Sequence, residues 1–353
     1  MNFPAETLHA VNERNERNEP PLAGANCCNS ASTTFGSSTP LWSSDLLVSD
    51  PETLLHCQSD FGRVPVDLLL TATYQVSIKG FNDSKSDAFP AGIITSEIPR
   101  FLEKAIAIAE SATRQHHGSV ALSLGPYGAC MIPSQEYSGI YDGEHGSQSA
   151  LYQWHRERLA LFAQVPSISS RVAYMAMETI PRVDEIVAMR RALDSVSELS
   201  GLPFWMSCLY PGDDEALPTG ETIEEALRAM LDSSLARSVP WGVGINCTKV
   251  WKLPSTLKRY ETTMRDMVRQ GLVKEWPALV LYPDGTNGQV YNTTTQKWEG
   301  PGDTKDVKRV PWEEQLAGAV RGTESRGQWK QIVVGGCCMA SSEDISRLRK
   351  VLL

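Results

Sequence analysis

Three cysteines that follow apolar runs could together bind a metal ion. Cys247 comes directly after Gly242–Asn246, and Cys337 and Cys338 come shortly after Gln331–Gly335. Both runs are typical of buried parallel strands, whose carboxyl ends meet at one mouth of a barrel. Soft thiolate ligands favour Zn²⁺ over Mg²⁺ or Ca²⁺. Three protein ligands leave the fourth tetrahedral position open, which is typical of a catalytic zinc site.

Two other interpretations of these cysteines compete with metal binding. A single cysteine at a strand end is more often a small buried hydrophobe than a ligand, and adjacent cysteines could form a strained redox pair. Zinc is favoured because Gly335 and Gly336 remove side chains where the backbone must bend close to a bound group. The other cysteines are isolated or lack a preceding strand, and we interpret them as non-ligands: Cys27, Cys28, Cys57, Cys130 and Cys208.

The elements that must position these residues alternate along the chain. Seven short runs rich in Val, Ile and Leu predict buried parallel strands: Val66–Thr73, Ser119–Leu124, Val172–Glu178, Pro203–Leu209, Gly242–Asn246, Ala278–Tyr282 and Gln331–Gly335. Amphipathic stretches at helical spacing lie between them, as right-handed crossovers require. The pattern predicts an α/β fold, a (β/α)₈ TIM-type barrel with the first strand degenerate or missing. An open doubly wound sheet is the alternative, but its glycine-rich first turn is absent.

Composition limits the domain organisation and the partners. A chain of 353 residues with 41% hydrophobic and 21% charged residues suits one large barrel domain, which we place at residues 39–353 after an irregular or disordered segment at 1–38. A net charge of −9 without a basic cluster argues against nucleic acid and anionic membranes as partners. No apolar run approaches the roughly 20 residues of a membrane helix, so we expect a cytoplasmic protein.

Several motifs together resemble the homocysteine S-methyltransferase family. They are Leu41–Ser44, Leu70–Gln75, Gly125–Ala129, Glu178–Pro181, Gly-Ile-Asn-Cys ending at Cys247, and Gly-Gly-Cys-Cys ending at Cys338. The resemblance covers roughly Thr39–Leu353. It implies a zinc barrel that binds homocysteine as the fourth ligand and methylates it from a sulfonium or ammonium donor, giving methionine. Coordination to zinc deprotonates a thiol, so the acceptor sulfur needs no separate general base.

The resemblance also assigns residues to the substrate. Glu178 matches the family glutamate that holds the α-amino group of homocysteine, although a strand-end glutamate could instead cap the next helix. Thr71, Thr73 and Tyr74 line the pocket by resemblance, and core packing is an equal alternative for Tyr74. Asn246 also belongs to the expected substrate-binding residues, and we favour a role in orienting its loop over a role in the reaction.

Two aromatic residues, Trp42 and Tyr127, could offer their faces to a cationic donor, but core packing is favoured for both. For the donor we expect a sulfonium, S-methylmethionine or S-adenosylmethionine, over betaine. The reason is that Glu178–Pro181 reads Glu-Thr-Ile-Pro, which is typical of the branch that uses sulfonium donors.

The chain departs from the family pattern at its beginning. Family members open with a strand that leads into Asp-Gly-Gly or Asp-Gly-Ala, whereas the counterpart region here, Pro21–Ser32, has no apolar stretch and no acidic residue. The missing strand would leave the edges of its neighbours unpaired. The departure raises an alternative function, a non-catalytic or weakly active variant that binds zinc and homocysteine.

Overall fold

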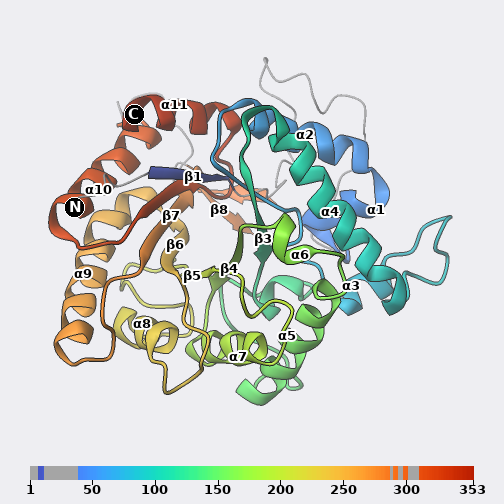
Figure 1. Ribbon diagram of the computed structural model, residues 1–353, viewed down its shortest axis with the longest axis horizontal. Coiled ribbons are helices and arrows are strands. Elements are labelled where there is room, and N and C mark those ends of the chain that lie inside the picture. Colours follow the sequence, from blue (N-terminus) through green and yellow to red (C-terminus); the bar gives the residue numbers. More distant parts are fainter. Residues whose placement is uncertain (1–6, 12–38, 287–288, 293–296, 301–309) are drawn as a thin grey trace.

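Eight parallel strands close into a barrel in the order β1-β10-β7-β6-β5-β4-β3-β2 (Figure 1). The computed structural model describes residues 7–11, 39–286, 289–292, 297–300 and 310–353. The barrel strands are β1 (Thr7–Val11), β2 (Leu68–Leu70), β3 (Ser119–Leu124), β4 (Tyr174–Ile180), β5 (Phe204–Cys208), β6 (Gly242–Lys249), β7 (Ala278–Asp284) and β10 (Ile332–Gly336). The predicted TIM-type class and all seven predicted strands are therefore confirmed.

The first strand is present, and the prediction that it is degenerate or missing is not confirmed. β1 pairs in parallel with β10 along all five of its residues, from Thr7 to Val11, and with β2 at Ala10 and Val11. It lies upstream of Pro21–Ser32, a region outside the described residues. The prediction of an irregular segment at 1–38 accordingly does not hold for Thr7–Val11. Because β1 pairs on both sides, neither β10 nor β2 is left with an open edge.

Helices surround the strands, as Figure 1 shows. They are α1 (Leu46–Ser49), α2 (Pro51–Arg63), α3 (Ile78–Asp83), α4 (Ile98–Thr113), α5 (Gln148–Phe162), α6 (Ile168–Arg171), α7 (Val183–Asp194), α8 (Ile223–Leu231), α9 (Leu253–Arg269), α10 (Trp312–Arg326) and α11 (Ser342–Leu352). The helix α11 begins with a capping box, in which the Ser341 and Asp344 side chains each bind the other residue's backbone N–H. Among the described residues, no helix combines the length and apolar character needed to cross a membrane.

The core has two parts, because successive strand residues point to opposite faces of the sheet. The larger part lies between the strands and the helices, and includes Leu69, Leu122 and Val243. The smaller part is a cluster of buried residues that alternate with these along the strands: Leu68, Leu70, Ala121, Ala176, Trp205, Leu209, Cys247, Val280, Tyr282, Val333, Cys337 and Cys338. The three cysteines of interest thus belong to one packed cluster of strand and strand-end residues.

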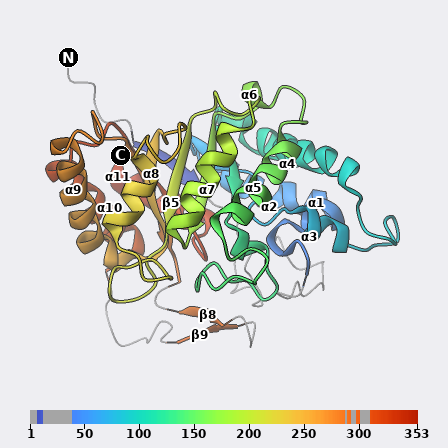
Figure 2. The same ribbon diagram turned by 90° about the horizontal axis from the view of Figure 1, so that it is seen from below.

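Two long connections follow the carboxyl ends of strands. One joins β3 to α5 and contains the short 3-10 helix η4 (Tyr127–Cys130). The other follows β7 and contains the antiparallel pair β8 (Val290–Asn292) and β9 (Lys297–Glu299). Figure 2 shows this pair standing apart from the barrel. These connections lie where a barrel enzyme assembles its site.

Deleting residues 1–11 is expected to destabilise the chain strongly. The deletion would unpair backbone groups of β10 and β2, and each unpaired buried group costs roughly 1–3 kcal/mol. A total of about 5 kcal/mol corresponds, for a chain of this length, to a melting temperature lower by about 7 °C, measured by circular dichroism. Removing only residues 1–6, which keeps Thr7–Val11, is the matched comparison and should leave the melting temperature near that of the full chain. Equal melting temperatures for the two truncated chains would contradict the role of β1.

Candidate metal and substrate site

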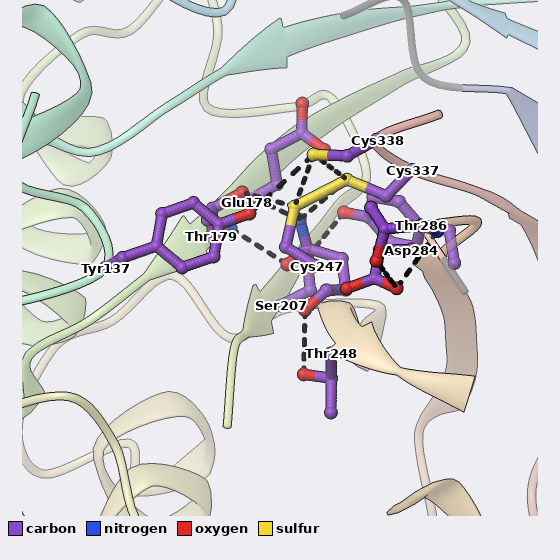
Figure 3. The surroundings of a disulfide bond; sticks show 12 residues. Tyr137, Glu178, Thr179, Ser207, Cys247, Thr248, Asp284, Thr286, Cys337 and Cys338 are labelled. Carbon is purple, nitrogen blue, oxygen red and sulfur yellow. Dashed lines mark hydrogen bonds between the residues drawn. A yellow bond between two sulfur atoms is a disulfide. The ribbon is translucent and has the colours of Figure 1, made fainter. Parts of the chain in front are cut away.

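Three cysteine sulfurs meet at the carboxyl ends of β6 and β10 (Figure 3). Their Sγ atoms all lie within 4.8 Å of one another. Cys338 Sγ is 3.9 Å from Cys247 Sγ and 3.8 Å from Cys337 Sγ, and Cys247 and Cys337 are joined by a disulfide. Each residue is no more than 2% exposed. The structure therefore brings together the three residues that the sequence singled out, although they are far apart in the chain.

The sulfur cluster fits a tetrahedral metal ion. Zn–S bonds of about 2.3 Å place two ligand sulfurs about 3.8 Å apart, close to both spacings of Cys338. Binding through all three sulfurs requires the Cys247–Cys337 disulfide to be reduced. No other group of three possible metal ligands was found in the part of the chain that the structure describes. Cys57, Cys130 and Cys208 lie outside the cluster.

At the ends of β4 and β6, the backbone is irregular and directs side chains toward the sulfurs. The pairing of β4 with β5 shifts register after Met177, and the pairing of β6 with β7 shifts after Asn246. At these shifts Thr179 has φ +59° and Cys247 has φ +48°. A left-handed conformation is costly for a β-branched threonine, and strain of this kind is concentrated at functional sites. The two irregularities lie next to each other, since Thr179 Oγ1 is 3.8 Å from Cys247 Sγ.

Asn246 links the two irregular strand ends. Its Oδ1 accepts a hydrogen bond from the Thr179 N–H (3.0 Å), and its Nδ2 donates to Thr179 Oγ1 (2.7 Å). The same Nδ2 also lies 3.3 Å from Cys247 Sγ and donates to it. The amide is wholly buried and occupied by these partners. Asn246 thus contacts both a candidate ligand and the irregular end of β4, whereas its predicted roles in binding substrate and in orienting its loop stay predictions.

The loop that carries Cys337 and Cys338 packs tightly against its surroundings. A Cβ at Gly336 would collide with the side chain of Ala340, and one at Gly285 would lie 2.9 Å from the Ala340 backbone nitrogen. Gly285 N–H donates to the Cys338 carbonyl (2.7 Å). Only glycine permits these approaches, which are made to Ala340, and the predicted approach of Gly335 and Gly336 to a bound group stays a prediction.

Glu178 lies inside the barrel beside the sulfur cluster (Figure 3). Its Oε1 accepts a hydrogen bond from Ser123 Oγ (2.5 Å). Burial, together with the charge of Glu178, raises the pKa of Tyr282 well above its usual value, so that hydroxyl stays protonated. The alternative of helix capping is wrong, because α7 begins at Val183 after Arg182 as N-cap residue, whereas Glu178 remains within β4.

The threonines after β2 are occupied by hydrogen bonds between strands. Thr71 Oγ1 and Thr73 Oγ1 are 2.7 Å apart, and Thr73 Oγ1 donates to the Ser123 carbonyl (2.7 Å). Thr71 Oγ1 accepts from the Ser123 N–H (3.1 Å). Tyr74 is 2% exposed, and its ring would lie 2.6 Å from a Cβ at Gly125. These contacts favour core packing for Tyr74. For Thr71 and Thr73 they favour a structural role, in which the side chains link the end of β2 to β3.

Tyr127 belongs to an aromatic cluster of the β3–α5 connection. Its ring stacks on His145, with centroids 4.1 Å apart, and meets Tyr141 and Trp154 edge-on. Its hydroxyl donates to Asp142. Burial and this hydrogen bond raise the pKa of Tyr127. Core packing, the role that the sequence favoured, agrees with these contacts. For Trp42, the structure shows a position at the start of the 3-10 helix η1 (Trp42–Ser44).

Sequence reasoning missed two residues that shape the site. Arg158 on α5 is buried, and its guanidinium donates to the carbonyls of Gly125 (2.6 Å) and Tyr74 (2.7 Å), which tie the ends of β3 and β2 together. Burial lowers its pKa. Tyr137, on the β3–α5 connection, places its hydroxyl 3.6 Å from Cys338 Sγ. A helix arginine and a loop tyrosine carry no periodic signal, so no pattern in the sequence marked them.

The fold and the site together define a (β/α)₈ barrel with a buried three-thiol cluster at the carboxyl ends of its strands. Residues 22–352 match the family described as homocysteine S-methyltransferase, and the chain belongs to this family. It is therefore an enzyme of the class that transfers a methyl group to homocysteine. The resemblance drawn from the motifs is confirmed.

Relatives of similar length support this assignment. A betaine-homocysteine S-methyltransferase of Drosophila melanogaster is 27% identical over 332 residues, covering 88% of this chain and 86% of that protein. Homocysteine S-methyltransferase 1 of Arabidopsis thaliana is 26% identical over 330 residues, covering 89% and 87%. Among solved structures, the metallated form of the homocysteine methyltransferase MmuM from Escherichia coli has a TM-score of 0.63 at 23% identity, covering 89% of each chain. This last likeness supports the barrel fold.

Proposed function

We propose that this chain converts homocysteine to methionine as a zinc-dependent methyltransferase. The observation that carries the proposal is the spacing of the Cys247, Cys337 and Cys338 sulfurs at a barrel mouth. Zinc held by these residues would keep the thiol of homocysteine deprotonated and therefore nucleophilic. The ligand thiols must stay reduced, which supports a cytoplasmic setting as part of the proposal.

The chain's own residues would bind and orient the acceptor. We assign the α-amino group of homocysteine to Glu178, because a carboxylate beside the sulfur cluster can hold an ammonium by a charge-assisted hydrogen bond. Ser123 Oγ donates to Glu178 Oε1 and so orients the carboxylate. We keep Thr71 and Thr73 as the pocket wall on the β2 side, where their hydroxyls hold neighbouring strands, and we assign core packing to Tyr74.

For the donor we propose a sulfonium, S-methylmethionine or S-adenosylmethionine. The support is the sequence Glu-Thr-Ile-Pro at Glu178–Pro181, which runs through the irregular end of β4. Betaine is the competing donor, since a relative of similar length is named for it. Both donors are methylated cations, and an aromatic wall would accept either.

Methionine formation from homocysteine should be faster with a sulfonium donor than with betaine. The measurement compares the three donors at equal concentration on reduced, zinc-loaded protein, with a protein-free reaction for each donor as background. We expect kcat/KM at least about tenfold higher with one of the sulfonium donors, a difference of about 1.4 kcal/mol in transition-state binding. Turnover with betaine alone would overturn the donor assignment.

A weakly active binding protein is the alternative function. One reason for this alternative is a missing first strand, and the presence of β1 removes that reason. The absence of Asp-Gly-Gly after the first strand still supports it, since Asn12 and Glu13 follow Val11 in the sequence. Tight binding of homocysteine without turnover by any of the three donors would favour this alternative.

A further inference from the structure

Each sulfur of the cluster has a polar neighbour outside the cluster. Asn246 Nδ2 lies 3.3 Å from Cys247 Sγ and 4.0 Å from Cys337 Sγ. For Cys338 the neighbour is Tyr137, whose hydroxyl lies 3.6 Å from its Sγ (Figure 3). Hydrogen bonds to ligand sulfurs tune how strongly they bind a metal. Tyr137 is the one of these neighbours that comes from a connecting segment and not from a barrel strand.

We infer that Tyr137 is a positioning residue for Cys338, whose sulfur it holds in the cluster through its hydroxyl. This inference rests on the proposed metal site. A ligating thiolate carries no proton, so the tyrosine hydroxyl is the donor in this contact. Cys338 is 1% exposed while Tyr137 is 42% exposed, so the tyrosine lies between the sulfur site and solvent.

The backbone around Tyr137 holds it in this place. Gln135 N–H donates to the Gly128 carbonyl (2.8 Å), and Gly139 N–H donates to the Gln135 carbonyl (2.8 Å), which closes a turn around the tyrosine. Arg182 donates to the Gly139 carbonyl (3.0 Å) from the start of α7. The turn is thus tied both to its own connection and to the helix that follows β4. An ordered turn can hold the hydroxyl against Cys338 with little further entropy loss.

Replacing Tyr137 with Phe tests the contact, because the change keeps the ring and removes only the hydroxyl. The matched control is Tyr127→Phe, which removes a hydroxyl of the same connection that donates to Asp142 and not to a sulfur. Both proteins and the wild type are reduced and loaded with Co²⁺, and their thiolate-to-cobalt charge-transfer absorption is compared. The rate at which Zn²⁺ passes to a chromophoric chelator is measured in parallel.

We expect the charge-transfer band of Tyr137→Phe to move to longer wavelength, because a thiolate without its hydrogen bond gives up an electron more easily. Zinc should leave this variant about tenfold faster, in line with the loss of other partners of metal ligands. Tyr127→Phe should match the wild type in both measurements. A merely structural role of Tyr137 would alter the melting temperature without moving the band.

The outcomes separate this inference from the proposed function. A wild type that takes up Co²⁺, together with a Tyr137→Phe variant whose band and zinc loss are unchanged, would overturn the positioning role alone. Equal shifts in Tyr137→Phe and Tyr127→Phe would overturn it as well, since the effect would then belong to the connection as a whole. A wild type that binds neither Co²⁺ nor Zn²⁺ would overturn the metal site and this inference with it.

Discussion

Changing Cys337 and Cys338 together to serine is expected to remove zinc and to lower turnover by roughly three orders of magnitude. A free thiol with a pKa near 8.5 is only about 3% thiolate at pH 7, so loss of the metal alone costs about 30-fold. Loss of the position that the metal gives to the acceptor sulfur costs at least about as much again. Elemental analysis of the reduced protein should find about one zinc per chain in the wild type, and none in the variant.

A matched control is available for this experiment in Cys130→Ser. Cys130 is a half-buried thiol outside the cluster, and its Sγ donates to the Gln75 carbonyl (3.3 Å), a bond that serine can keep. Burial raises the pKa of Cys130 to about 11, so this thiol is protonated at neutral pH and does not compete for the metal. The control should retain both zinc and turnover. Zinc retained by the Cys337/Cys338 variant would show that the assigned ligand set is wrong.

Changing Glu178 to glutamine is expected to raise the KM for homocysteine roughly 10- to 100-fold. The amide carries no charge, and a charged hydrogen bond is worth about 1.5–3 kcal/mol. The Ser123 hydroxyl can still donate to the amide oxygen, so the local packing is preserved. The measurement is the initial rate of methyl transfer as a function of homocysteine concentration, at a saturating concentration of the donor.

A thermodynamic cycle makes the Glu178 experiment specific for the amino group. The same rates are measured with 4-mercaptobutanoate, the thiol that lacks the α-amino group of homocysteine. The wild type should prefer homocysteine, and Glu178→Gln should lose most of that preference. Glu261→Gln is the control, since Glu261 is an equally buried carboxylate bound to Arg326 and Thr323 and not to the sulfur cluster. If Glu178→Gln kept the full preference, the amine would have to bind elsewhere.

The sequence predicted the sulfur cluster correctly because its positions depend on strand ends alone. Apolar runs identify the strands, and in a parallel barrel all the carboxyl ends lie at one mouth, where β6 and β10 flank β7. Cys247 and the pair at 337 and 338 follow such runs, so their approach required no knowledge of side-chain packing. The predicted seven strands agree with the structure for the same reason.

The parts that were missed depend on contacts that leave no periodic pattern. The strand Thr7–Val11 contains a threonine and a histidine and precedes the polar run that begins at Asn12, so it does not stand out as a continuous apolar run. Tyr137 lies in a connection without periodicity, and only the hydrogen bonds of its turn and the packing of the Cys338 loop place it beside a sulfur. Long-range packing of this kind is not encoded in local spacing.

The pairing of β1 with β10 also has a consequence for how the protein is made. Among the described strands of the barrel, β1 comes first in the chain and its neighbour β10 comes last, so the barrel cannot close until Ile332–Gly336 has left the ribosome. Contacts of such large sequence separation form late in folding. Two of the three sulfurs directly follow β10, so the cluster, and with it the proposed metal site, can form only after β10 has been synthesised.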